Sequence, residues 1–282
     1  NKDHVLLKLD HLDAALIRKR LPAIRDMVLT FAGVDLCDTP APVFPTAHYT
    51  MGGIPTNRFG EVVAPIEHGP EERIPGLYAA GECACVSVHG GNRLGGNSLL
   101  DIIVFGRAAG NQIIEYLGEN RYHQTLDDDC LEPALQRLAR WEQPDEGESV
   151  DALRRELTQT MEDHCGVFRT AEVLNEGVDK MLALQRRMVD VRLRDHSQIF
   201  NTARIEALEL ENLMDVAVAT MLSAQQREES RGAHSRVDFP ERDDVNWLRH
   251  SLYHKASNSV DYKPVRTKPL TVDSFPPKPR SY

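Results

Sequence analysis

The sequence predicts a mixed α/β region followed by an all-α region, that is, the fold class α/β plus α. Three observations predict it. Short apolar segments bounded by glycine and proline, typical of strands, lie before residue 90. A glycine-rich turn over residues 89–96, here called the glycine turn, leads directly into a long apolar run that predicts a helix. Beyond residue 150, apolar residues repeat at intervals of three and four, which predicts packed helices.

The first region, residues 1–44, opens with a strand-like alternation over residues 5–10. Two helical stretches follow, around residues 16–21 and 24–31. Prolines at positions 40, 42 and 45 then mark the places where helical structure stops. The first region is therefore expected to combine one strand with two short helices.

The second region, residues 45–118, contains short strands and the glycine turn. Residues 74–82 predict a turn, a short buried strand and a glycine–acid pair ending in Glu82, the kind of strand end at which α/β sheets place a cofactor. Ser98 is expected to be the N-cap of the helix after the turn, and that helix start favours an anion or an electron-rich ring. A glycine-rich loop without a ligand is the alternative.

The third region, residues 119–229, begins with an acidic linker around residues 127–129. Three apolar repeats, within residues 153–161, 174–191 and 205–220, predict the helices of an antiparallel bundle. The last region, residues 230–282, is rich in Arg, Asp, His and Pro, and its prolines argue against regular helix. We expect it to run over the other regions as an extended tail.

Composition narrows the function classes. With 41% hydrophobic and 27% charged residues the chain can bury a core, and no stretch approaches the ~20 apolar residues of a membrane span. A net charge of −10, with basic residues interspersed among acids, argues against nucleic acid as a partner. The five cysteines form no spacing typical of a metal site or a disulfide framework, which fits reduced thiols in a cytosolic or matrix compartment.

Three motifs follow one another along the chain: HYTMGGIPTN at residues 48–57, GLYAAGE at 76–82 and VSVHGGNRLGGNSLLD at 86–101. In their order and spacing they resemble the flavoprotein subunits of the FAD-dependent succinate dehydrogenase/fumarate reductase family. The resemblance continues through ESRGAHSR at residues 229–236 and on to Trp247, so it covers essentially the whole chain.

The resemblance implies four structural parts. Residues 1–44 would be the remnant of a capping domain, residues 45–118 part of a Rossmann-type FAD-binding domain, residues 119–229 the antiparallel helical bundle and residues 230–282 the extended C-terminal tail. The G-x-G-x-x-G fingerprint that opens such FAD domains is absent from these residues, and the chain starts without methionine. We therefore interpret it as the carboxy-terminal half of a longer protein. The family's FAD-linked histidine and proton-accepting arginine would lie before residue 1.

The resemblance also assigns roles. His48 and Arg93 would bind a dicarboxylate substrate, and the planar guanidinium of Arg93 suits a carboxylate because it donates two parallel hydrogen bonds. Glu82, Ser98 and Leu99 would contact FAD, the last two at the helix start, where backbone N–H groups stabilise negative charge. No metal site is expected in the chain. The implied reaction is oxidation of succinate to fumarate with FAD as hydride acceptor.

The family's architecture implies partners as well. An iron–sulfur subunit and membrane anchor subunits would complete the complex, placing the chain peripherally on the cytoplasmic face of a bacterial inner membrane or on the mitochondrial matrix side. Fumarate reductase and L-aspartate oxidase flavoproteins share the motifs and are alternatives. A further alternative is a non-catalytic fragment that only binds a partner subunit; on either interpretation the chain by itself is expected to be inactive.

Overall fold

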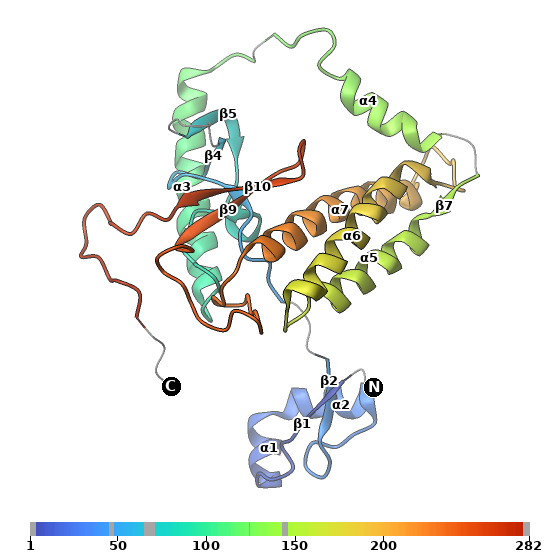
Figure 1. Cartoon of the computed structure of the whole chain (residues 1–282), viewed down its shortest axis with the longest axis vertical. Helices are drawn as coiled ribbons and strands as arrows, with labels where there is room; N and C mark the ends of the chain where they lie inside the picture. The colour runs from blue at the N-terminus through green and yellow to red at the C-terminus, as the bar shows by residue number, and fades with distance from the viewer. Residues whose placement is uncertain (1–3, 45–47, 65–70, 124, 143–145, 279–282) are drawn as a thin grey trace. The chain divides into compact units, whose positions relative to one another are not determined.

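The computed structural model describes residues 4–44, 48–64, 71–123, 125–142 and 146–278 (Figure 1). These residues belong to two compact units, residues 1–50 and residues 51–282. Helices and short strands occur in both units, which confirms the mixed character of the predicted class.

The first unit contains one small sheet and two helices. Strands β1 (Val5–Leu7) and β2 (Ala41–Val43) pair antiparallel, and helices α1 (Ala14–Arg20) and α2 (Pro22–Ala32) lie between them in the chain. The Asp13 side chain caps α1 by accepting a hydrogen bond from the Ala15 N–H at 2.6 Å. The buried core of the unit is Ile17, Leu36, Cys37 and Ala41. The strand and both helices predicted for this region are present.

The second unit opens with four short strands. β3 (Ile54–Pro55) pairs parallel with β6 (Ala84–Cys85), and β4 (Glu61–Ala64) pairs antiparallel with β5 (Glu72–Tyr78). The prediction of a buried strand here was wrong for β5, whose residues 72–77 are exposed. Among the described residues β5 pairs with β4 alone, which leaves most of its side chains uncovered.

Helix α3 (Asn97–Glu119) follows the glycine turn and is long but little buried. Only Asp101 and Ala109 are buried within it. Seven of its large apolar side chains are exposed, namely Leu99, Leu100, Ile102, Ile103, Val104, Ile114 and Leu117. No helix in the described part of the chain is both long enough and apolar enough to cross a membrane.

Three long helices form the main core of the second unit. They are α5 (Val150–Cys165), α6 (Ala171–Arg187) and α7 (Thr202–Gln226), and Ser149, Thr170 and Asn201 cap their N-termini with side-chain hydrogen bonds. The end of α5 lies beside the start of α6, since His164 Nδ1 is 3.2 Å from the Val173 carbonyl oxygen. Arg187 at the end of α6 reaches back to Glu156, so α5 and α6 run in opposite directions.

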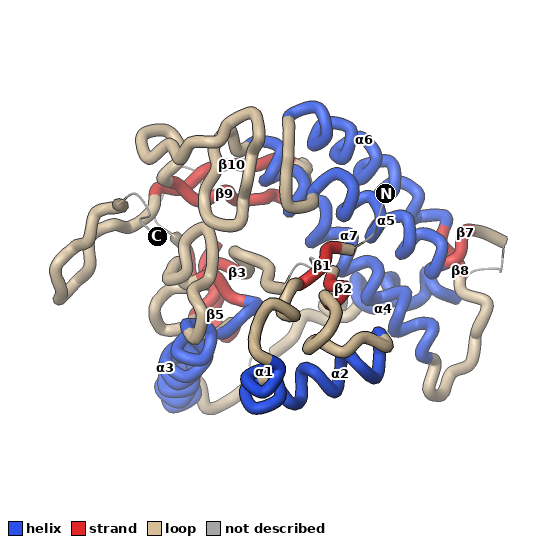
Figure 2. Tube along the Cα trace, turned by 90° about the horizontal axis from the view of Figure 1, so that it is seen from below, coloured by secondary structure: helices blue, strands red, loops and turns tan. Residues whose placement is uncertain are grey.

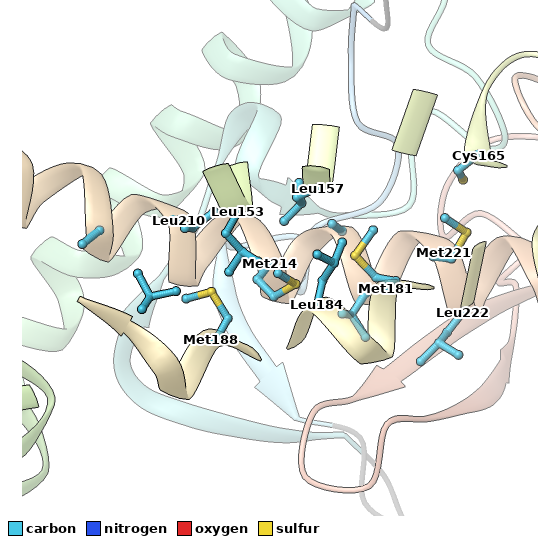
Figure 3. Close-up of a cluster of buried hydrophobic side chains, with 14 of the residues drawn as sticks. Leu153, Leu157, Cys165, Met181, Leu184, Met188, Leu210, Met214, Met221 and Leu222 are labelled. Atoms are coloured by element: carbon cyan, nitrogen blue, oxygen red, sulfur yellow. The ribbon is translucent and has the colours of Figure 1, made fainter. Parts of the chain in front are cut away.

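Leucine and methionine side chains from the three helices meet between them (Figure 3). Leu153, Leu174, Leu210 and Met221 are fully buried there, and Met181 and Met214 are almost fully buried. The apolar repeats predicted all three helices, and in α5 and α6 the same side chains supply the packed face. In α7 the predicted face was wrong, because Ile205, Leu213 and Val216 of its repeat are exposed. A shorter helix, α4 (Glu132–Ala139), precedes the group, and β7 (Glu148–Ser149) pairs with β8 (Val191–Arg192) beside it (Figure 2).

The carboxy-terminal region is more ordered than predicted. Residues 230–282 were expected to be an extended tail, but they contain an antiparallel hairpin of β9 (Arg249–His254) and β10 (Ser259–Pro264) (Figure 1). The Tyr253 and Val260 side chains pack against the helical core, and Trp247 meets Tyr262 edge to face. These contacts with α7 and its neighbours fix the hairpin, and Pro264 is tolerated because it is the last residue of its strand.

Candidate functional site

The glycine turn enters α3 through a left-handed glycine. Gly96 has φ +81° and is the N-cap of α3, so the helix begins at Asn97. The prediction that Ser98 is the N-cap was therefore wrong, because Gly96 turns the chain into the helix before Ser98 is reached. Ser98 instead lies in the first helical turn, where its Oγ atom is buried and has no hydrogen-bond partner among the described residues.

A side-chain hydrogen bond closes the turn onto the helix. His89 Nε2 lies 2.8 Å from Asp101 Oδ2, and the two side chains are 12% and 5% exposed. His89 stands at the beginning of the turn and Asp101 in α3, so the contact ties the ends of the segment that carries Arg93. Sequence reasoning left His89 without a role. The signal that could have found the pair is a histidine and an aspartate on opposite sides of a glycine-rich loop.

Arg93 is half-buried at the centre of the turn. A side chain built at Gly95 or Gly96 would meet no described atom within 4 Å, so the turn borders open space on the side of α3. Leu94, next to Arg93, is 63% exposed. An arginine held in a turn with free space beside it is suited to bind a carboxylate through its planar fork.

Glu82 and Leu99 lie on two elements in contact. Glu82 is exposed in the short 3₁₀ helix Gly81–Cys83, which packs on α3. The contact is close, because a Cβ at Gly81 would come within 3.0 Å of Ile102 Cγ2. Leu99 and Ser98 are in the first turn of α3, with Leu99 64% exposed. The structure thus brings the elements carrying the three predicted cofactor residues together.

His48 belongs to the other compact unit. It lies at the end of residues 1–50, where its side chain is exposed, whereas Arg93 lies in residues 51–282. Its pairing with Arg93 across a substrate stays a prediction. No group of three or more metal-ligating side chains occurs among the residues that the structure describes.

A network of charged side chains that lies next to the glycine turn was not predicted as part of the site. Glu229 is fully buried and accepts hydrogen bonds from Arg227 at 2.6 Å and from Arg231 at 2.7 and 2.9 Å. The backbone N–H of Asp243 donates to the same carboxylate at 2.9 Å. Arg231 also bonds Asp244 at 2.7 Å, which holds the pKa of that carboxyl below its usual value.

This network reaches the glycine turn through backbone atoms. The Ala233 N–H donates to the Gly91 carbonyl oxygen at 2.9 Å. Ser87, just before the turn, has φ +70° and lies 3.1 Å through its Oγ from His250 Nε2 on β9. The carboxy-terminal region therefore contacts the chain on both sides of His89.

His234 is a half-buried neutral histidine in the same region. Its Nδ1 accepts a hydrogen bond from Arg169 at 2.8 Å, and its Nε2–H donates to the Arg227 carbonyl oxygen at 3.1 Å. Burial, together with the nearby charges of Arg169, Arg227 and Arg236, lowers its pKa to about 4. This geometry gives His234 a structural role in a polar contact between segments.

Comparisons with known proteins agree with these motifs. A family model described as FAD binding domain matches residues 1–99, and one described as fumarate reductase flavoprotein C-term matches residues 154–282. A succinate dehydrogenase flavoprotein subunit from Coxiella burnetii is 51% identical over 99% of this chain and 47% of its own length. The fumarate reductase flavoprotein subunit of Escherichia coli is 39% identical, over 99% of this chain and 45% of its own.

The fold has solved relatives as well. A variant of Escherichia coli quinol fumarate reductase superposes with a TM-score of 0.83 at 39% identity, over 96% of this chain and 46% of that chain. The chain spans about half the length of the curated relatives it matches. The two family models, together with identities above 40% over nearly all its residues, show its relationship. The chain belongs to the FAD-dependent succinate dehydrogenase/fumarate reductase flavoprotein family.

Proposed function

We propose that the whole protein is the flavoprotein subunit of a succinate dehydrogenase, which oxidises succinate to fumarate. The observation that carries the proposal is Arg93, held in a glycine turn that is tied to α3 by His89 and Asp101 and borders open space. The 51% identity to a succinate dehydrogenase flavoprotein subunit, against 39% to a fumarate reductase one, favours this direction of the reaction.

The residues described here fit FAD. The buried Oγ of Ser98, which has no partner among the described residues, offers a hydrogen bond at the start of α3. Leu99 lies beside it near the positive end of a 23-residue helix, with its own N–H donated to the Gly96 carbonyl oxygen at 3.1 Å. Glu82 can accept hydrogen bonds from ligand hydroxyls. When bound, FAD supplies the hydride acceptor that oxidation of an unactivated C–H bond requires.

In this proposal Arg93 binds and orients the substrate. Its two parallel N–H donors hold one carboxylate against rotation, and its charge persists when water is excluded. His48 would bind the same substrate. Holding a dicarboxylate by its ends fixes the carbon that loses hydride, and such orientation contributes several kcal/mol to rate acceleration.

The partners in this proposal are an iron–sulfur subunit and membrane anchor subunits, with a dicarboxylate as substrate and no nucleic acid. Electrons from a flavin must pass on one at a time, and the described cysteines form no cluster-binding group. The partner would then supply the metal centres and keep the protein peripheral, at the cytoplasmic face of a bacterial inner membrane or the matrix side of a mitochondrial one. A fumarate reductase or L-aspartate oxidase would use the same Arg93 clamp.

The decisive experiment replaces Arg93 by lysine in the full-length protein. Lysine keeps the charge but loses the fork, so the carboxylate can pivot, and a misplacement of about 1 Å lowers the rate by about a hundredfold. We expect kcat and substrate affinity to fall together while flavin content stays unchanged. His48→Ala should affect KM more than kcat. Near-normal kcat/KM in Arg93→Lys at full flavin occupancy would refute the assignment.

A further inference from the structure

We propose that residues 229–236, here called the bracing segment, act as a positioning element for Arg93. The inference rests on the proposed role of Arg93 in binding substrate. The bracing segment lies more than 130 residues beyond the glycine turn in sequence, and it contacts the turn immediately before Arg93. Its effect would reach the substrate only through the backbone of the turn.

The two segments meet backbone to backbone. A Cβ added to Gly232, which has φ +61°, would lie 2.2 Å from the carbonyl carbon and oxygen of Gly91 and 2.7 Å from the Asn92 nitrogen. A Cβ on Gly91 would come within 2.9 Å of Arg231 Cγ and 3.0 Å of its carbonyl oxygen. The contact has room for no side chain from either glycine, so it fixes the peptide that precedes Arg93.

The bracing segment is itself held firmly. Glu229 is buried and bonded by Arg227, Arg231 and the backbone N–H of Asp243. The two-point contact between Arg231 and Glu229 sets the orientation of the Arg231 side chain, whose Cγ faces Gly91. A support fixed in this way can hold the turn in one place.

The opposite end of the segment is anchored to the helical core. Arg236 is 2% exposed and makes a two-point contact with Asp238 at 2.8 Å for each bond. Its Nη1 also donates to carbonyl oxygens at the end of α7, to that of Gln225 at 3.3 Å and to that of the C-cap Arg227 at 3.0 Å. Ala233, between the two anchored ends, donates its N–H to Gly91. The geometry therefore points to a brace that joins the helical core to the substrate-binding turn.

The main test is Gly232→Ala in the full-length protein. The new methyl group must displace the backbone of Gly91, and we expect kcat/KM for succinate to fall about a hundredfold, as for a 1 Å error in placement. Two controls separate the causes. Gly33→Ala introduces alanine at φ +66° with no described atom within 4 Å, and Gly147→Ala places a methyl 2.3 Å from the Asp190 carbonyl oxygen in the helical region. Both should stay within about threefold of the wild type, since neither touches the turn.

A double-mutant cycle distinguishes positioning from general destabilisation. If Gly232 acts through Arg93, the double variant Gly232→Ala with Arg93→Lys should have about the same kcat/KM as the less active of the two single variants. Losses that multiply would mean that the two residues act independently, and would overturn the proposal. An effect of Gly232→Ala no larger than that of the two controls would overturn it as well.

A second variant tests the brace if Gly232→Ala fails to fold, and a second readout tests it if the proposed function is wrong. Arg231→Lys keeps a charge beside Glu229 but loses the fork, so a loss of about tenfold in kcat/KM is expected. Amide hydrogen exchange over residues 89–96 should accelerate in Arg231→Lys and Gly232→Ala but not in Gly147→Ala. Unchanged exchange in both bracing variants refutes the brace. If the wild-type protein does not oxidise succinate, the proposed function fails, while the exchange result still decides the brace.

Discussion

His234 should make the stability of the protein fall in mild acid. Its ring is neutral because burial, more than the charges of Arg169, Arg227 and Arg236, lowers its pKa to about 4. In the unfolded chain the pKa is about 6.5. Between these two values the unfolded chain binds a proton that the folded protein excludes, so acid favours unfolding.

The magnitude follows from the two pKa values. A fall from 6.5 to about 4 corresponds to about 3 kcal/mol, at about 1.4 kcal/mol for each tenfold change in proton affinity. This contribution is present in full above pH 6.5, declines as the pH drops toward 4, and is lost below that value.

The assay is urea unfolding of the full-length protein at several values of pH, with His234→Gln as the variant. Glutamine can accept the hydrogen bond from Arg169 and donate one to the Arg227 carbonyl, but it does not titrate. The stability difference between wild type and variant should change by about 3 kcal/mol between pH 7 and pH 4. His123→Gln, at an exposed site, is the matched control. A difference between wild type and His234→Gln that is constant over this range would refute the reasoning.

Three further predictions can be checked separately. Leu210→Ala truncates a fully buried side chain of the helical core and should lower the free energy of unfolding, measured by urea denaturation, by about 2–5 kcal/mol. Leu126→Ala, at an exposed site, should leave the free energy of unfolding nearly unchanged. The 282-residue chain purified alone should neither hold FAD stoichiometrically nor reduce a dye with succinate; bound flavin with dye reduction would contradict this. The full-length protein should co-purify with an iron–sulfur subunit, and quinone-linked activity from an isolated monomer would show otherwise.

The sequence predicted the helical core well because its signal is local. Residues 153–161 and 174–191 carry the apolar side chains that α5 and α6 bury, so spacing located both helices and their packed faces. For residues 205–220 spacing located α7 but not its buried face, which only packing against α5 and α6 defines. The hairpin β9–β10 escaped notice because its apolar residues are few and its surroundings are rich in proline. Its stability comes from packing against distant elements.

The site shows the same division between local and distant causes. The glycine turn and Arg93 were recognised from a contiguous motif, whereas the capping role given to Ser98 was wrong because Gly96 adopts a left-handed conformation. The contact between Gly91 and Gly232 could not be predicted, since it depends on two backbones that meet only in the folded protein. Local pattern thus located the glycine turn, and tertiary contacts determine how firmly it is held.

The meeting of Gly91 and Gly232 has a consequence for which substitutions the chain can accept. A clash between two side chains can be relieved by shortening one of them, but glycine has no side chain left to shorten. If positions 91 and 232 are both varied to all amino acids, no substitution at one of them should therefore restore the activity lost through a substitution at the other. Gly118, where a Cβ would meet no described atom within 4 Å, should accept alanine readily. Two glycines of the same chain would then differ sharply in their tolerance of alanine, and the difference would come from the atoms that surround each glycine in the folded protein.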